Sequence, residues 1–259
     1  MKPVTCALAA LALSLSLAAS VWGGRAEAAE AVAPPEVDWS FSGIFGTFNR
    51  ASAQRGLEVY KQVCSSCHGM DLVSYRALTG IGLSPEQVDA LAATHEVNAC
   101  CTDAGEPFTR PAKAADRFVS PFPNPQAART ANNGALPPDL SLIEKAREGG
   151  ADYIHAVLTG YEETPPAGVT LMPGMYYNKY FPGHQIGMPP PLSDGIVTYS
   201  DGTEATLDQQ ATDVVTFLTW AAEPTMEARK ETGVKVLLFL IVLTAFLYAL
   251  KRKIWSDVH

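Results

Sequence analysis

Residues 64–68 of this chain are Cys-Ser-Ser-Cys-His, and they restrict its possible folds more strongly than any other segment. Two thiols separated by two residues, with a histidine directly after them, are the attachment signature of a c-type haem. The spacing lets both sulfurs reach the two vinyl-derived carbons on one edge of the porphyrin and places the next side chain beneath the iron. The sequence therefore predicts thioether bonds from Cys64 and Cys67 and axial ligation by His68.

Two other uses of a Cys-x-x-Cys pair compete with haem attachment. A redox-active dithiol prefers a strand-to-helix entry, whereas residues 56–63 indicate a helix that leads into the motif. A zinc site needs a second pair of ligands, and the sequence contains no other Cys-x-x-Cys. Haem attachment is the favoured interpretation, and it fits a protein that is exported.

The N-terminus carries the pattern of an export signal. Lys2 precedes an apolar run over residues 7–21, and Ala26-Glu27-Ala28 follows the small-x-small rule for cleavage. The alternative is a permanent N-terminal anchor, but the run is short and rich in Ala and Ser. We expect cleavage after Ala28, so that residues 1–28 are a signal peptide.

A second apolar segment, near the C-terminus, predicts a membrane anchor. Residues 232–250 contain a single charge, Lys235, and span roughly 28 Å as a helix, which is enough to cross the hydrocarbon core. The basic residues 251–253 then favour a cytoplasmic end. We therefore expect a single-pass protein of the cell inner membrane, with a periplasmic haem domain over residues 29–231 and a cytoplasmic tail over residues 251–259.

Charge is distributed unevenly between the body of the chain and its ends. The 259 residues carry a formal net charge of −8, yet residues 29–227 hold 24 acids against 11 bases. Nucleic-acid binding needs clustered Lys and Arg, so no nucleic-acid partner is expected. The acidic body favours a basic protein partner, for which Glu162 and Glu163 are candidate contacts. Their alternative role is that of solvated loop charges.

The rest of the sequence predicts a mainly α fold with long irregular loops. Helices are expected over residues 48–63, 84–94, 141–148, 152–159 and 207–222. Residues 107–125, which are rich in Pro, and residues 160–192, which are rich in Pro and Gly, are expected to form loops. A small hairpin is expected around Asp201-Gly202, because this dipeptide suits a tight turn.

A haem iron held by one histidine needs a sixth ligand, for which the residues alone leave several choices. The candidates are His95, His155, His184, Met70, Met172, Met175, Met188 and Met226. Met188 is followed by three prolines, which stiffen the chain beside its sulfur. Met172 and Met175 flank a Pro-Gly pair and compete with it. For each methionine the alternative is packing in the core.

Further motifs occur in order along nearly the whole mature chain. They are residues 131–141 (ANNGALPPDLS), 145–150 (KAREGG), 152–153 (DY), 158–161 (LTGY), 173–178 (PGMYYN), 181–183 (FPG), 186–190 (IGMPP) and 220–224 (WAAEP). Together with the haem motif they resemble the cytochrome c1 family, the membrane-anchored c-type haem subunits of the cytochrome bc1 complex. The resemblance implies a c-type cytochrome haem domain, mainly α, with one C-terminal transmembrane helix.

The resemblance also selects among the iron ligands. It implies one covalently bound haem c, with His68 and Met188 as the two axial ligands. The pair Cys100-Cys101 departs from the family pattern. Neighbouring cysteines form a disulfide only within a strained ring, so the sequence leaves their pairing and their role open.

Four more residues match family positions around the haem. Asn132, Arg147 and Tyr153 correspond to positions near the haem propionates, where an arginine can neutralise a buried carboxylate. The alternative role of Arg147 is that of a solvated helix charge. Pro138, together with the proline before it, is implied to pack against the haem edge and keep water from the iron.

The function that the resemblance implies is electron transfer, so the chain is not an enzyme on its own. In the family, quinol oxidised in cytochrome b reduces the Rieske iron–sulfur protein, which reduces this haem, and the haem reduces a soluble cytochrome c. Membrane lipid surrounds the anchor. The second hypothesis is a membrane-tethered haem enzyme or sensor, such as a peroxidase, which needs an open or displaceable sixth ligand.

Overall fold

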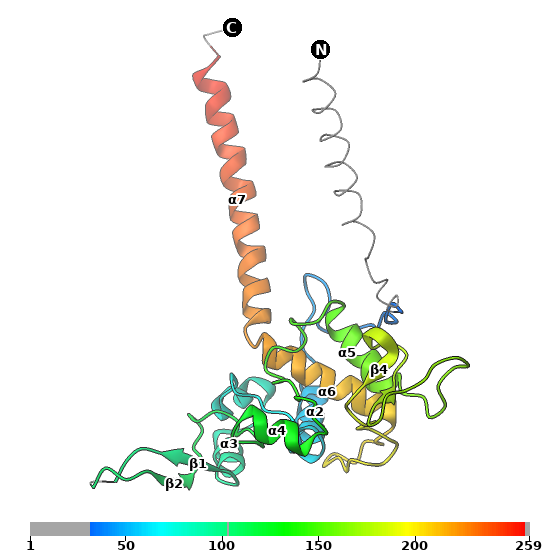
Figure 1. The fold of residues 1–259 in the computed structure, drawn as a ribbon. Helices are drawn as coiled ribbons and strands as arrows, with labels where there is room; N and C mark the ends of the chain where they lie inside the picture. Colours follow the sequence, from blue (N-terminus) through cyan, green and yellow to red (C-terminus); the bar gives the residue numbers. More distant parts are fainter. Residues whose placement is uncertain (1–31, 103, 257–259) are drawn as a thin grey trace, which may run out of the picture.

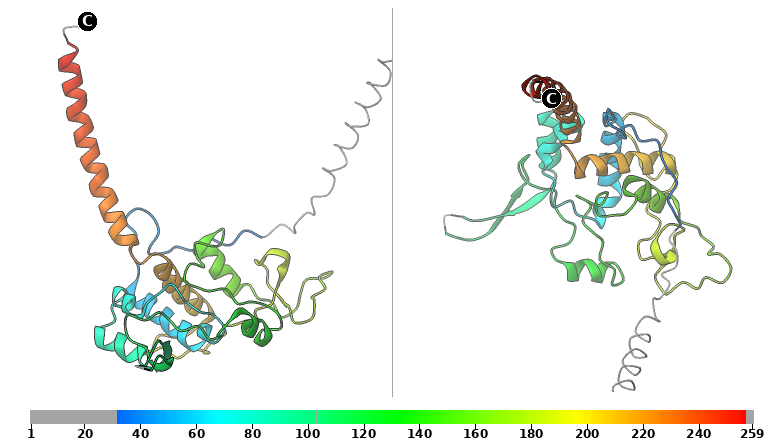
Figure 2. Two further views of the ribbon diagram at one scale, coloured as in Figure 1. Left: turned by 60° about the vertical axis from the view of Figure 1, so that its left-hand side comes forward. Right: turned by 90° about the horizontal axis from the view of Figure 1, so that it is seen from above.

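The computed structural model describes residues 32–102 and 104–256 (Figure 1). The predicted signal peptide, residues 1–28, lies outside the described residues. A helical body with long loops is followed by one long helix, α7 (Met226–Ile254), which extends away from it (Figures 1 and 2). This architecture confirms the mainly α prediction.

The centre of the body is formed by two helices, α2 (Arg50–Gln62) and α6 (Leu207–Ala222), which pack directly against each other. Their close approach depends on Gly56 of α2, because a Cβ there would collide with the backbone oxygen of Asp213 and the Cβ of Phe217. Apolar side chains of both helices are buried around this contact. The helices predicted over residues 48–63 and 207–222 are thus confirmed, with slightly shorter bounds for the first.

A buried polar network also joins α2 to α6. The carboxylate of Asp213, which is fully buried, accepts hydrogen bonds from Ser52 Oγ (2.6 Å), Arg55 Nε (2.8 Å), Arg55 Nη2 (3.0 Å) and Gln209 Nε2 (2.9 Å). Arg55 also donates to the exposed carboxylate of Asp201 (3.0 Å). Because the Cys-x-x-Cys-His motif directly follows α2, this network fixes the motif relative to the core.

The remaining helices are short and lie around this pair. They are η1 (Cys64–Ser66), η2 (Tyr75–Ile81), α3 (Pro85–Ala92), α4 (Pro125–Ala131), α5 (Gly150–Thr159) and η3 (Pro182–His184). The helices predicted over residues 84–94 and 152–159 are confirmed as α3 and α5. Ser84 forms the expected N-cap of α3, with a complete capping box.

The helix predicted over residues 141–148 is wrong. This segment is a series of turns, because its first residue is used in a long-range contact. Ser141 Oγ accepts a hydrogen bond from the backbone N–H of Leu72 (3.0 Å), and the N–H of Ser141 donates to Asp139 (2.8 Å). Gly149 then takes a left-handed conformation (φ 84°) immediately before α5.

Two small antiparallel ribbons are present, and all of their strands except the first lie in segments predicted as loops. Strand β1 (Glu96–Ala99) pairs with β2 (Phe108–Pro111), and β3 (Tyr176–Tyr177) pairs with β4 (Gln185–Ile186). Both strands of each ribbon are edge strands, where a terminal proline is tolerated. The β1–β2 ribbon projects from the body (Figures 1 and 2), and a disulfide joins Cys100 to Cys101 just beyond β1.

The hairpin predicted around Asp201-Gly202 is absent from residues 196–206, all of which the structure describes. The backbone N–H groups that would pair with a second strand bind side chains of α2 instead. Thr198 N donates to Gln62 (3.2 Å), and Ser200 N donates to Glu58 (3.0 Å). The segment therefore follows α2 as an extended loop.

Helix α7 is the one described helix that is long and apolar enough to cross a membrane. It has 29 residues, and its most apolar 18-residue window has a mean hydropathy of 2.4 and no residue buried in the body. It begins at Met226, six residues before the predicted start of the anchor, so the transmembrane helix continues directly into the body.

Candidate haem site

The two cysteines of the motif lie on a turn that continues α2. The N–H groups of Cys67 (3.1 Å) and His68 (2.9 Å) both donate to the carbonyl of Cys64, so that η1 brings the three side chains together. Cys64 and Cys67 are free thiols and partly buried. Burial raises the pKa of Cys64 to about 12, whereas reactive redox cysteines have a lowered pKa.

The zinc alternative also lacks support. Among residues 32–102 and 104–256, no group of three or more His, Cys, Asp or Glu side chains could hold a metal ion. A structural zinc site takes four such ligands. The motif therefore offers two thiols and one imidazole, which is the donor set of a c-type haem.

His68 is oriented by a hydrogen bond to the backbone. Its Nδ1 lies 2.7 Å from the carbonyl oxygen of Pro138. A carbonyl can only accept, so Nδ1 carries the proton and the lone pair is on Nε2, the nitrogen that is left to bind a metal. Burial lowers the pKa of His68, an effect that the Pro138 carbonyl opposes, and the neutral ring is the form that ligates.

The segment that holds His68 is itself fixed by a second row of hydrogen bonds. Leu140 N donates to the carbonyl of Gly69 (2.9 Å), and Asp71 N donates to Asp139 Oδ2 (2.7 Å). Gly69 has no room for a side chain, because a Cβ there would collide with Ser120 Oγ. Residues 138–141 are thus held alongside residues 68–72, and this pairing sets the position of the Pro138 carbonyl.

Met188 lies in a loop that packs against the chain just before residues 138–141. A Cβ built on its neighbour Gly187 would lie 3.2 Å from the Cβ of Ala135, three residues before Pro138. The hydroxyl of Tyr161 donates to the carbonyl of Met188 (3.1 Å). The backbone of Met188 is therefore restrained on two sides, and its side chain is partly buried.

The other candidate ligands differ in their surroundings. Met70 and Met226 are buried in the hydrophobic core, and Met172 is 56% exposed. His155 Nε2 lies 3.2 Å from Asp208. Met175 remains a competitor, because its sulfur is 3.8 Å from the Cβ position built on Gly187. Both methionines thus lie beside Gly187, which contacts Ala135, and Met188 as the ligand stays a prediction.

The residues matched to the propionates lie on two separate elements. Asn132 ends α4, and its side-chain amide donates to the carbonyl of Ala128 (2.8 Å). Arg147 is exposed before α5, and Tyr153 is partly buried on α5. Burial raises the pKa of Tyr153, and the nearby charge of Arg147 opposes that shift. The structure thus brings Arg147 and Tyr153 together, while a role for any of these residues at the haem remains a prediction.

Three residues that position the site were missed from the sequence. Asp139 and Tyr161 make the contacts described above, and the Tyr60 hydroxyl donates to the carbonyl of His68 (3.2 Å). The role of Asp139 could have been predicted from the sequence, because an aspartate after two prolines is typical of a side-chain-stabilised turn. Tyr60 lies one helical turn before Cys64, which also points it toward the motif.

Comparison with known proteins decides the family. A sequence model of the cytochrome C1 family matches residues 39–258. The chain belongs to the cytochrome c1 family. It is 50% identical over 252 residues to a cytochrome c1 of Rhodospirillum rubrum, an alignment that covers 91% of this chain and 93% of that protein.

Other members of the family show the same degree of similarity. A mitochondrial cytochrome c1 heme protein of Solanum tuberosum is 52% identical over 232 residues, covering 89% of this chain and 88% of that protein. A cytochrome b/c1 of Bradyrhizobium diazoefficiens is 49% identical over 278 residues, covering 98% of this chain. The chain spans only 40% of the length of that last relative. Membership confirms the resemblance drawn from the ordered motifs and a body of the cytochrome c1 fold with one transmembrane helix.

Proposed function

We propose that this chain is the haem-carrying electron-transfer subunit of a cytochrome bc1 complex, a ubiquinol–cytochrome c oxidoreductase. One covalently bound haem c accepts electrons from the Rieske iron–sulfur protein and passes them to a soluble basic cytochrome c. Cytochrome b is the neighbouring subunit in the membrane. The observation that carries the proposal is the His68 ring, held with Nε2 free beside two thiols on the same turn, in a chain of the cytochrome c1 family.

The residues present fit a c-type haem, and each has a definable task. Cys64 and Cys67 form the thioether bonds, and neutral thiols are the form that burial favours at Cys64. His68 presents Nε2 to the iron while Pro138 holds the proton on Nδ1. When bound, the haem supplies one-electron exchange at its iron.

Met188 would complete the proposed ligand set. Its carbonyl is held by Tyr161, and three prolines follow it, so little conformational entropy is lost when the thioether is ordered. His/Met ligation raises the reduction potential and leaves no open position for a substrate. These restraints favour an electron carrier over a peroxidase or a gas sensor, which needs a displaceable ligand.

The charge of the body supports a basic acceptor. Glu162 and Glu163 are exposed and directly follow Tyr161, the residue that contacts the backbone of Met188. Acidic side chains at this place increase the encounter rate with a carrier whose surface is rich in lysine. The contact must also dissociate quickly, so a small and hydrated interface is expected.

The proposed topology follows from the two ends of the chain. The haem domain lies in the periplasm, and α7 crosses the inner membrane with its basic end, residues 251–253, in the cytoplasm. The haem therefore lies on the side of the membrane where a soluble cytochrome c collects electrons.

Purification of a tagged full-length chain in mild detergent tests the proposal. We expect a b-type cytochrome and an iron–sulfur protein to copurify, and we expect quinol to reduce the haem of this chain only in that assembly. A haem-loaded chain that purifies alone from its native membrane and reacts with peroxide would contradict the proposal. Intact mass after acidic acetone extraction checks the covalent attachment of one haem.

A further inference from the structure

Two large apolar side chains next to the anchor helix face solvent. Ile44 is 68% exposed and Phe45 is 82% exposed, and both lie in the loop of residues 42–47. The aromatic residues that flank this loop, Phe41 and Phe48, are buried, and their rings pack at a tilt of 42° with centroids 5.4 Å apart. Adjacent exposed apolar residues forfeit the free energy of hydrophobic burial, so such a pair marks a contact surface.

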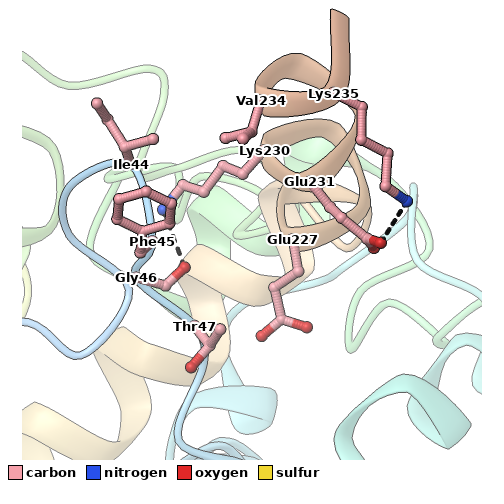
Figure 3. A pocket seen from close by; sticks show the side chains of 9 residues that line it. All are labelled: Ile44, Phe45, Gly46, Thr47, Glu227, Lys230, Glu231, Val234 and Lys235. Atoms are coloured by element: carbon pink, nitrogen blue, oxygen red, sulfur yellow. Dashed lines mark hydrogen bonds and ion pairs between the residues drawn. The ribbon is translucent and has the colours of Figure 1, made fainter. Parts of the chain in front are cut away.

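The loop is held rigidly against the first turns of α7. Lys230 Nζ donates to the carbonyls of Phe41 (2.7 Å) and Gly46 (3.1 Å), the second of which is drawn in Figure 3. Glu227 accepts a hydrogen bond from the backbone N–H of Phe48 (2.8 Å). Gly46 permits the tight return, because a Cβ there would collide with the backbone oxygen of Ser42. The loop and the start of α7 therefore move as one unit.

The tip of the loop reaches α7 where the apolar run begins. A groove of about 270 Å³ separates Ile44 and Phe45 from α7, and it is lined on the helix side by residues that include Val234 and Lys235 (Figure 3). The uncharged run of the transmembrane helix starts at Val236. Figures 1 and 2 show the loop rising from the body on the side from which α7 extends.

We propose that Ile44 and Phe45 insert into the interfacial layer of the lipid bilayer beside α7, which gives the haem domain a second contact with the membrane. Lipid is favoured as the occupant because the loop is bound to the first turns of the transmembrane helix and shares a groove with Lys235, the last charged residue before the uncharged run. A lysine at that level places its amine among the headgroups. Apolar side chains beside cationic residues are the composition that binds at this depth.

The second contact has a mechanical consequence for the haem domain. A single helix alone leaves the body free to rotate and tilt about its point of entry. Two lipid contacts, joined through Lys230 and Glu227, fix the height and tilt of the body above the membrane. This inference depends on α7 as a membrane span and is independent of the electron partners of the haem.

A nitroxide spin label at residue 45 tests the proposal in the full-length, haem-loaded chain. The variant Phe45→Cys is labelled and placed in phosphatidylcholine–phosphatidylglycerol nanodiscs, and the label's collision rates with oxygen and with a water-soluble nickel chelate are measured. Ile196→Cys is the matched control, because Ile196 is an exposed apolar residue of the body (51%) outside the loop. The identically treated parent chain gives the background.

We expect the ratio of oxygen to nickel collisions to be higher at residue 45 than at residue 196. Equal ratios would overturn the proposal. A second result would also overturn the proposal: a label at residue 45 that is accessible to nickel in the nanodisc and protected only in the copurified multi-subunit assembly. In that case a protein subunit, and not lipid, would cover the loop.

Two lysine variants test how the loop is held. Lys230→Met, made in the labelled chain, removes the amine that binds the two loop carbonyls, and we expect the label at residue 45 to become more mobile and more accessible to nickel. Lys145→Met is the control, because that amine binds Glu223 (3.3 Å) and makes no contact with the loop. The same response in both variants, or in neither, would contradict the role of Lys230.

Discussion

Replacing Asp213 with asparagine tests the buried network that joins α2 to α6. The carboxylate is fully buried and accepts four hydrogen bonds, two of them from Arg55. Asparagine keeps the volume but removes the charge, so a mostly buried guanidinium loses its main counter-ion. Breaking one partner of a buried ion pair costs about 3–5 kcal/mol, which is a large part of the roughly 5–15 kcal/mol that stabilises a typical protein.

The measurement is thermal unfolding of the full-length, haem-loaded chain in detergent, followed by circular dichroism in the Soret region. For a body of this size, each kcal/mol corresponds to about 2–4 °C, so Asp213→Asn should lower the midpoint by roughly 10 °C. Asp201→Asn is the matched control, because Asp201 binds the same Arg55 from an exposed position, where a pair contributes about 0–1 kcal/mol. Equal shifts in the two variants would refute the reasoning.

Three further predictions concern the surface and the anchor. Electron transfer from the reduced chain to a basic cytochrome c should slow as salt rises from about 10 to 300 mM. The double variant Glu162→Gln, Glu163→Gln should lower the rate at low salt. A rate that does not change with salt would contradict the acidic docking surface. A chain that ends after Lys235 should be released from the membrane by a salt wash with its haem still bound, because the single apolar loop binds lipid only weakly. Retention of this shortened chain on the membrane would reveal another lipid-binding segment. The hydrogen bond from Arg110 lowers the pKa of Asp116 to about 2, whereas the pKa of an aspartate in an unfolded chain is about 4. The stabilisation of the base of the β1–β2 ribbon is therefore present above pH 4 and is lost as the pH falls toward 2. Hydrogen exchange of that ribbon measures this loss, which Asp116→Asn should abolish.

The parts of the fold that the sequence predicted are those decided by local patterns. Helices α2 and α6 carry apolar residues at helical spacing, α3 has its capping box at Ser84, and α7 is apolar over more than four turns. The haem motif is equally local, since its chemistry needs two thiols and an imidazole within five residues. Such features are decided by neighbours in the sequence.

The segments that were predicted wrongly are decided by distant partners. Ser141 would suit a helix start, but its hydroxyl binds the backbone of Leu72, 69 residues earlier. The hairpin expected near Asp201 is replaced by bonds to Glu58 and Gln62, more than 130 residues away. The contact from Tyr161 to Met188 is of the same kind. No spacing rule reveals these pairs, because each joins residues that are far apart in the sequence.

The identity of the second axial ligand is the most direct test of the account. In Met188→Leu we expect the haem to remain covalently attached, the reduction potential to fall by a large margin, and the reduced haem to bind carbon monoxide. The parent chain and Met175→Leu should not bind it. Carbon monoxide binding by Met175→Leu, with Met188→Leu unchanged from the parent, would contradict the ligand assignment, and binding by the parent chain itself would contradict the proposed electron-carrier site.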